Sequence, residues 1–436
     1  MAIYLKQSMQ TSEASDVKVQ KTVSELLQRI KNQGETAVIE LAEQLDGWTR
    51  DFILNPDEIR ELVSQVPQQV KDDIRFAHDQ IFGFAVKQRE SLQAFETELT
   101  PGVVLGQRLV PCQCAGCYIP GGRFAHAASA IMSVATAKAA GVPYIVACTP
   151  PRGESINSTV AYALSLSGAD VIMALGGVQA IATMAAGLFT GKAADIIVGP
   201  GNAYVAEAKR LLYGEIGIDV FAGPTESLII ADHGADPLIV AVDLVSQCEH
   251  GYDSPVWLLT DSKALGDTVI EIIPKVIADL PNPEVAASSW ENYGEVVLCE
   301  NREELATLSD QYAAEHVQVM AADLDWYLQN LKNFGSLFLG EGCTVSHGDK
   351  TSGTNHILPT KKAARYSGGL NVTKFIKILT YQKLSTAANR TIGAVTSRIS
   401  RYEGMEGHAR AADIRLRKYF PEEDFDFEVY DHKLSL

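Results

Sequence analysis

The chain has 436 residues, of which 46% are hydrophobic and 21% are charged, a composition typical of a folded globular protein and not of a disordered one. It carries 37 lysines and arginines against 54 aspartates and glutamates, a formal net charge of −17. So acidic a surface repels phosphate backbones, and we therefore expect no nucleic-acid partner. The length predicts two or three domains.

Residues 18 to 98 predict helices, because apolar residues recur there at helical spacing and the first long segment stops at Gly47. From 104 to 235, short β-branched runs that end in Gly or Pro alternate with Ala-rich segments. This serial strand–helix pattern predicts a parallel sheet with helices on both faces. A second α/β sheet is expected from 227 to 345, and the chain after 371 loses the rhythm and predicts helices.

We recognise no targeting signal in the sequence. The first twenty residues have no apolar segment of the secretory kind. The longest uncharged run, 171–191, contains four glycines and predicts strand, turn and helix instead of a membrane span. We therefore expect a cytoplasmic protein with no membrane partner and reduced thiols.

One cysteine cluster has a spacing that metal sites use. Cys112, Cys114 and Cys117 form C-x-C-x-x-C, but no second cluster completes four ligands. The surrounding segment alternates like a buried strand, and free cysteine behaves as a small apolar residue. We interpret the three cysteines as core residues.

Two short motifs carry groups suited to metal binding and proton transfer. Gln247 and His250 lie three residues apart on a predicted helix, so their side chains share a face and could converge on one metal ion. Glu315 and His316 are adjacent where a helix should end and a strand begin, and could serve as two separate proton-transfer groups. A solvated helix face and a surface loop are the alternative interpretations.

Three further segments are rich in polar or glycine residues. The segment 347–360 is predicted to be a long polar loop, and it holds Asp349, Asn355 and His356, which favours a functional role. A glycine-rich turn near the C-terminus holds Glu403 and His408. The segment 199–210 follows a predicted strand and opens a helix whose N-terminus favours anions, although no G-x-G-x-x-G fingerprint occurs in that context.

Eight short motifs occur together in one order, and in that order they resemble the histidinol dehydrogenase family from about residue 20 to 415. They lie at 118–123, 176–182, 199–210, 219–226, 246–250, 313–316, 348–360 and 403–408. The resemblance implies an α/β fold of two Rossmann-like parallel-sheet domains with an N-terminal helical region and a C-terminal helical arm, assembled as an intertwined homodimer. It also implies one zinc ion per subunit, NAD, and oxidation of a primary alcohol to a carboxylate through a bound aldehyde.

The resemblance also implies domain boundaries. Residues 1–117 would form the N-terminal helical region and part of the first α/β domain, and 118–226 the second α/β domain on the NAD side. Residues 227–370 would complete the first α/β domain and carry the zinc and proton-transfer groups. Residues 371–436 would form the arm that contributes to the partner's site.

Site residues follow from the same resemblance, one motif at a time. The zinc ligands would be Gln247, His250, Asp349 and His408, and the general bases Glu315 and His316, all six of which would also contact the substrate. NAD contacts would fall on Tyr118, Gln179 and Asn202. Further substrate contacts would be Thr225, His356 and Glu403, with Glu403 and His408 completing the neighbouring subunit's site.

The sequence departs from histidinol dehydrogenases around the far end of the substrate. His126 stands where a tyrosine–proline–serine stretch is usual, and Lys361 and Lys362 follow the Leu-Pro-Thr motif. This pattern resembles the sulfopropanediol 3-dehydrogenase branch, which implies an anionic alcohol, 2,3-dihydroxypropane-1-sulfonate, oxidised to 3-sulfolactate. Solvated lysines and an L-histidinol substrate are the alternative. A zinc hydrolase with Glu315 as base, or a non-catalytic metal-stabilised dimer, are alternatives of another class.

Overall fold

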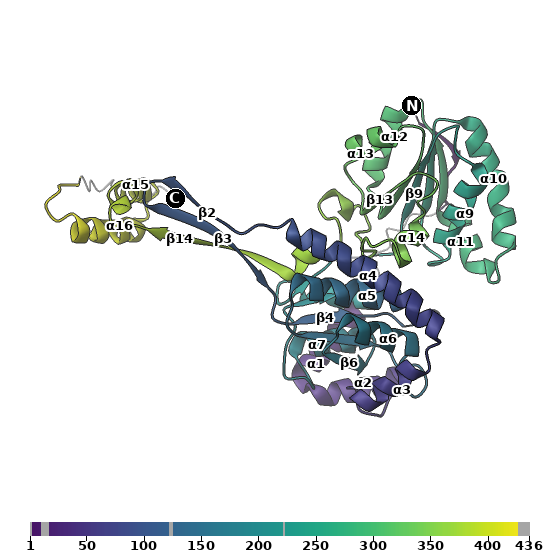
Figure 1. Cartoon of the computed structure of the whole chain (residues 1–436), viewed down its shortest axis with the longest axis horizontal. Coiled ribbons are helices and arrows are strands. Elements are labelled where there is room, and N and C mark those ends of the chain that lie inside the picture. The colour runs from purple at the N-terminus through teal and green to yellow at the C-terminus, as the bar shows by residue number, and fades with distance from the viewer. Residues whose placement is uncertain (1, 10–16, 122–124, 221–222, 426–436) are drawn as a thin grey trace. The chain divides into compact units, whose positions relative to one another are not determined.

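The computed structural model describes residues 2–9, 17–121, 125–220 and 223–425 (Figure 1). These fall into two compact units, the first made of Met1–Glu90 and Pro111–Phe375 and the second of Ser91–Val110 and Ile376–Leu436. None of the helices in these described ranges is both long enough and apolar enough to cross a membrane.

The first unit contains a five-stranded parallel sheet in the order β6-β5-β4-β7-β8. Its strands are β4 (Ala115–Tyr118), β5 (Ile145–Thr149), β6 (Val171–Ala174), β7 (Ile196–Val198) and β8 (Gly217–Ile218). Counted along the chain, this is the order 3-2-1-4-5, which is the doubly wound Rossmann-like arrangement. The sheet therefore reverses its direction of growth between β4 and β7.

Two groups of helices cover this sheet (Figure 1). One group is α3 (Pro56–Ser64), α4 (Gln68–Glu90), α5 (Ala127–Ala140) and α6 (Ser158–Ser167). The other is α1 (Val17–Gln33), α2 (Glu35–Asp46), α7 (Gly177–Ala186) and α8 (Ala203–Leu212). The strands are buried on both faces, which explains why they are continuous apolar runs in the sequence.

A second sheet of six strands has the order β1-β11-β10-β9-β12-β13. Five strands are parallel and again follow the order 3-2-1-4-5, and β1 adds antiparallel to β11 at the edge. The strands are β1 (Ile3–Lys6), β9 (Ser227–Ala231), β10 (Val256–Thr260), β11 (Gly294–Leu298), β12 (His316–Met320) and β13 (Ser336–Leu339). Both sheets therefore share one topology.

Alternate residues of β9 enter two separate apolar cores, one on each face of the second sheet. Ile229 and Ala231 pack with α9 (Pro237–Cys248), α10 (Lys263–Ala278) and α11 (Pro283–Tyr293). Leu228 and Ile230 face the opposite core, which includes residues of α12 (Arg302–Tyr312) and α13 (Leu324–Asn330). Because side chains alternate across a strand, one run of five residues supplies both cores. The short helix α14 (Val345–Lys350) follows β13.

The second unit is a three-stranded sheet with two helices. The sheet has the order β14-β3-β2, from β2 (Phe95–Thr100), β3 (Val103–Pro111) and β14 (Ile376–Leu384), and β2 pairs antiparallel with β3. The helices α15 (Ala388–Tyr402) and α16 (Glu406–Tyr419) pack on each other, joined by a buried ion pair of Arg401 and Asp413, Nη2 to Oδ2 2.6 Å.

The two parallel α/β sheets predicted from the sequence are confirmed, and three strands were missed. The region 18–98 ends in strand β2 and not in helix, and the segment after 371 contains β14, after a short 3-10 helix Val372–Phe375 and before its two α-helices. All six residues of β2 and seven of the nine in β14 are exposed, so neither strand has the alternation of buried and exposed residues by which a strand is recognised. The four residues of β1 likewise lack a buried member.

The cysteine prediction is also confirmed. Cys112, Cys114 and Cys117 are buried free thiols, and burial raises the pKa of the Cys114 thiol to about 11. Cys112 and Cys114 lie in the connection between β3 and β4, so the single strand expected there is two strands.

Candidate active site

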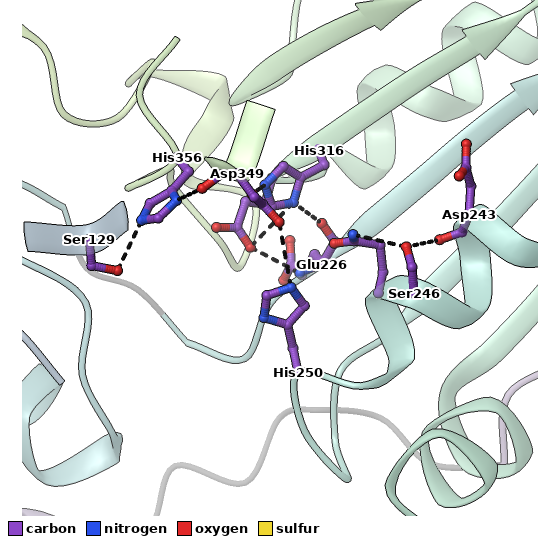
Figure 2. A network of polar contacts seen from close by, with 10 residues as sticks. Ser129, Glu226, Asp243, Ser246, His250, His316, Asp349 and His356 are labelled. Carbon is purple, nitrogen blue, oxygen red and sulfur yellow. Dashed lines mark hydrogen bonds and ion pairs between the residues drawn. The ribbon is translucent and has the colours of Figure 1, made fainter. Parts of the chain in front are cut away.

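The first unit contains a polar cluster that includes Glu226, His250, His316 and Asp349 (Figure 2). The cluster lies at the amino ends of β9 and β12, two neighbouring strands in which His316 pairs with Ser227. Glu226 directly precedes β9, and Glu315 directly precedes β12, as the sequence predicts for the Glu-His pair. Ligands of doubly wound sheets usually bind at the carboxyl ends of such strands. Here the cluster uses the same central strands and the opposite edge.

Glu315 and His316 are both held by the main chain of Glu226. The amide of Glu226 donates to Glu315 Oε2 at 3.0 Å, and the carbonyl of Glu226 faces His316 Nδ1 at 3.1 Å. A carbonyl oxygen can only accept, so Nδ1 carries the hydrogen and Nε2 keeps its lone pair. His316 Nε2 is buried and has no hydrogen-bond partner among the described residues.

The environment shifts the pKa values of these two groups in opposite directions. Burial raises the pKa of the Glu315 carboxyl well above its usual value, and the neighbouring carboxylates of Glu226 and Asp349 raise it further. Burial lowers the pKa of His316 to about 4, so the imidazole is neutral near pH 7. The pair therefore offers a free imidazole nitrogen beside a carboxyl group that holds protons strongly.

Asp349 connects His316 to His250. Its Oδ1 lies 3.7 Å from His316 Nε2, and its Oδ2 lies 3.7 Å from His250 Nε2. Burial alone would raise the pKa of Asp349, but the imidazoles of His250, His316 and His356 outweigh it and lower that pKa. The carboxylate is thus ionised. Asp349 lies in α14 and not in the loop expected for it, and His250 lies two residues past the end of α9.

The buried amide of Gln247 is oriented by its neighbours. Gln247 Nε2 donates to Ser246 Oγ at 3.3 Å, and Ser246 Oγ donates to the carbonyl of Asp243 at 2.8 Å (Figure 2). Gln247 Oε1 is left buried with no hydrogen-bond partner in the described part of the chain. A buried carbonyl oxygen without a donor is costly, and a cation would satisfy it.

Within the first unit, the donor set fits a zinc ion in part. An amide oxygen, an imidazole and a carboxylate are all groups that zinc binds. No group of three or more His, Cys, Asp and Glu side chains in the described residues is arranged to hold a metal. The first unit offers two ligands of these types, His250 and Asp349, with Gln247 as a third of another type, so a zinc ion bound here would need a fourth ligand from outside this unit.

His356 and His126 border the same cluster. His356 Nδ1 donates to the carbonyl of Asp349 at 2.9 Å, so its Nε2 accepts from Ser129 Oγ at 3.1 Å. Burial lowers the pKa of His126 to about 4, and repulsion by the positive charge of Lys350 lowers it further. Burial therefore favours the neutral imidazole of His126 near pH 7, and the substrate contact expected of His126 stays a prediction.

The three residues expected to contact NAD lie at the carboxyl edge of the first sheet. Tyr118 ends β4, and its hydroxyl accepts from the amide of Gly177 at 3.2 Å. Gln179, in the first turn of α7, donates through Nε2 to Asp46 Oδ2 at 3.1 Å. Asn202 caps α8 and accepts from the amides of Tyr204 and Val205. This edge is where doubly wound sheets hold dinucleotides.

The turn before Asn202 requires glycine. Gly199 has φ +119°, and a Cβ atom there would come within 1.9 Å of the Tyr118 carbonyl oxygen. Its amide donates to Asp219 Oδ2 at 2.7 Å and its carbonyl accepts from Lys209 Nζ at 2.8 Å. Asp219 and Lys209 are themselves a buried ion pair, so this backbone is held close to β4.

Lys361 and Lys362 form a turn with both residues in the left-handed region, φ +53° and +63°. They line a cavity of about 460 Å³ with Thr360, Ala363, Arg365 and Tyr366. Arg365 is a third cationic residue at this cavity. The segment 122–124, which precedes His126, lies outside the described residues.

Glu403 and His408 belong to the second unit, and both are exposed within a single chain. Glu403 follows the last residue of α15, and His408 lies in the first turn of α16 and not in a turn between helices. Thr225 is half-buried and directly precedes Glu226. The roles expected of these three residues stay predictions.

Sequence reasoning missed several members of the site. Asp46, Ser246, Arg365 and Glu226 orient or border the predicted residues. Glu226 and Ser246 had a signal, because Glu226 ends the 219–226 motif and Ser246 opens the 246–250 motif. Asp46 and Arg365 lie outside the eight motifs.

The fold is α/β, and its polar cluster brings a neutral imidazole beside a carboxyl group, two groups that can transfer protons. A family model described as "Histidinol dehydrogenase" matches residues 9–416, so the chain belongs to the histidinol dehydrogenase family and is an oxidoreductase. It is 54% identical to a sulfopropanediol 3-dehydrogenase of Ruegeria pomeroyi, over 97% of this chain and 98% of that protein.

A "Histidinol dehydrogenase homolog" of the same organism is 55% identical, over 92% of this chain and 93% of that protein. Among solved structures, a histidinol dehydrogenase from Elizabethkingia anophelis superposes with a TM-score of 0.88 at 32% sequence identity, covering 94% of each chain. The chain is therefore similar in fold to a histidinol dehydrogenase and more similar in sequence to these two relatives.

Proposed function

We propose that this enzyme is a zinc- and NAD-dependent dehydrogenase that oxidises 2,3-dihydroxypropane-1-sulfonate to 3-sulfolactate through a bound aldehyde. The observation that carries the substrate assignment is the cavity bordered by the three cationic residues Lys361, Lys362 and Arg365. The amide of Lys361 is bonded to Glu226, whose main chain holds the Glu315–His316 pair. The 54% identity to a sulfopropanediol 3-dehydrogenase supports the same assignment. Family membership favours oxidation over the hydrolase alternative.

Zinc and NAD would be held by two different sets of residues. Gln247, His250 and Asp349 would bind zinc, with His408 of a second copy as the fourth ligand. Tyr118, Gln179 and Asn202 would contact NAD. When bound, zinc would polarise the alcohol oxygen as a Lewis acid and NAD would accept hydride.

The two bases divide the proton transfers. His316 is neutral, and its free Nε2 takes the proton of the substrate hydroxyl in the first oxidation. The aldehyde must then gain water before a second oxidation. In its ionised form Glu315 takes the water proton, and the raised pKa makes this carboxylate a stronger base. Because the Glu226 main chain holds both groups, each is oriented before substrate arrives.

The lysine turn would bind the anionic end of the substrate. A sulfonate is a permanent anion with three acceptor oxygens, and ammonium groups suit it as donors of charge-assisted hydrogen bonds. The neutral imidazole of His126 could contribute a hydrogen bond but no charge. L-histidinol, which carries cationic groups, would be repelled by the same lysines.

Replacing Lys361 or Lys362 with alanine should therefore weaken sulfonate oxidation selectively. Losing one charge-assisted bond costs about 1.5–3 kcal/mol, which corresponds to about ten- to a hundredfold in kcat/KM. His126→Ala should cost less, because that side chain is neutral. Kinetics with the sulfonate and with propane-1,2-diol measure the selectivity, since the diol has no charge to lose.

Lys275→Ala provides the matched control, because Lys275 is an exposed lysine in the last turn of α10. It should leave both substrates unaffected. Full sulfonate activity in all three site variants would show that the lysines are solvated and that the anionic end binds elsewhere.

We also expect each active site to be built from residues of two subunits. If His408 serves the neighbouring subunit, each site draws on two chains. A mixed dimer of His316→Ala and His408→Ala subunits would then contain one site with neither mutation. Mixing the two inactive variants under conditions of subunit exchange should restore part of the activity. No recovery, with exchange verified by mass spectrometry of differently tagged subunits, would place His408 in the site of its own chain.

A further inference from the structure

We infer that Glu226 is a positioning residue that holds the Lys361–Lys362 turn in place for the anionic end of the substrate. The inference rests on the proposed anion recognition. Glu226 is 5% exposed and directly precedes β9, and its side-chain Oε1 accepts from the amide of Lys361 at 2.8 Å. One buried carboxyl group is thus bonded to the first residue of the lysine turn.

The same residue holds the proton-transfer pair through its main chain. Its amide donates to Glu315 Oε2, and its carbonyl accepts from both the ring and the amide of His316, at 3.1 and 3.2 Å. These contacts do not depend on the side chain. The Glu226 side chain can therefore hold the lysine turn independently of these main-chain contacts. Its removal should leave Glu315 and His316 in position.

The lysine turn needs such a contact. Residues with a Cβ atom rarely adopt positive φ, because the Cβ crowds the following carbonyl oxygen. Four described residues other than glycine do so, and Lys361 and Lys362 are two of them in succession. A strained turn persists where its surroundings fix it, and the bond to the Glu226 carboxylate is one such constraint. Thr360 adds another, since its Oγ1 accepts from the amide of Gly223 at 2.5 Å.

The side chain of Lys361 also packs closely against Gly223. A Cβ atom on Gly223 would lie 2.7 Å from Lys361 Cε, so the stem of Lys361 passes directly over that glycine. Glu226 Oε2 is buried and has no hydrogen-bond partner in the described ranges. Burial raises the pKa of Glu226 to about 7, while Lys361 and Lys362 act to lower it. A buried carboxyl group with only one oxygen hydrogen-bonded destabilises the fold. Such a group is expected at a position where its contact with the lysine turn serves substrate binding.

The experiment compares Glu226→Ala, Glu226→Gln and Glu226→Asp in the full-length enzyme. The alanine variant removes the acceptor for the Lys361 amide, the glutamine variant retains an acceptor oxygen, and the aspartate variant, which keeps the charge, serves if the alanine variant does not fold. In the alanine and aspartate variants, KM for the sulfonate should rise about tenfold or more, the loss expected for one charge-assisted bond. The ratio of kcat/KM for the sulfonate to that for propane-1,2-diol should fall by about the same factor, because any effect of Glu226 on the Glu315 carboxyl is common to both substrates. The glutamine variant should behave like the wild type.

Hydrogen–deuterium exchange of a peptide spanning 360–363 gives a readout that needs no substrate. The Lys361 amide should exchange faster in the alanine and aspartate variants and at the wild-type rate in the glutamine variant. Asp310→Ala is the matched control, because Asp310 Oδ1 accepts from the amides of Lys332 and Asn333 elsewhere in the first unit. It should change neither the sulfonate KM nor exchange at 360–363.

Each of the other possible outcomes would contradict a particular part of the inference. Unchanged exchange at 360–363 in the alanine and aspartate variants would mean that Glu226 does not hold the turn. Faster exchange with an unchanged sulfonate KM would mean that the turn does not serve recognition. A glutamine variant as impaired as the alanine variant would assign the effect to charge and not to position. A wild-type enzyme that does not oxidise the sulfonate would overturn the proposed function, and the exchange result would still decide whether Glu226 fixes the turn.

Discussion

Replacing His316 with alanine is expected to slow oxidation of the alcohol by about 10²–10⁴-fold, the usual contribution of a general base. The imidazole is held by the Glu226 carbonyl with Nδ1 protonated, so Nε2 alone can accept the substrate proton. Alanine removes that acceptor, while the main-chain amide of residue 316 can still donate to the Glu226 carbonyl. Initial rates of NADH formation from the alcohol measure the loss, and His233→Ala, at an exposed histidine, is the control.

Glu315→Gln should separate the two oxidations. It leaves His316 in place, so aldehyde formation should be largely retained, while conversion of added aldehyde to acid should fall more strongly because the water has lost its base. Each variant is therefore assayed with alcohol and with aldehyde. Equal losses in both steps for both variants would show that the two groups act as one unit, and the division of roles would be wrong.

Removing the metal should abolish oxidation almost completely, and added zinc should restore it. The buried Gln247 Oε1 has no hydrogen donor among the described residues, and the ionised Asp349 lies beside His250 and His316, so a cation would suit both oxygens. Asp349→Ala should lose both zinc and activity. Zinc content by mass spectrometry, measured beside activity and the circular dichroism spectrum, distinguishes loss of metal from loss of fold. Full activity in an enzyme shown to be metal-free would remove zinc from the account.

Regular apolar patterns made both parallel sheets predictable. The runs of β5, β6, β9 and β10 are buried on both faces, so burial and sequence carry the same signal. Strands β2 and β14 could not be found in the same way, because their side chains are mostly exposed and the pairing of distant segments alone makes them strands.

Local patterns identified the reactive groups but not their arrangement. The Glu-His pair was placed correctly at the start of a strand, whereas Asp349 was assigned to a loop, because the helix that holds it, VSHGDK, has a glycine and no apolar periodicity. No local motif reveals that the cluster lies at the amino edge of its sheet. That edge is set by Glu226 and Glu315, which are 89 residues apart in the chain and meet only because β9 pairs with β12.

The most direct test of the central claim is NADH formation by the purified, zinc-loaded enzyme with 2,3-dihydroxypropane-1-sulfonate and L-histidinol side by side. The proposed function predicts a far higher kcat/KM for the sulfonate, with two NADH formed for each sulfonate consumed and 3-sulfolactate as the product. A far better reaction with L-histidinol would contradict the sulfonate assignment and return the enzyme to the biosynthetic reaction of its family.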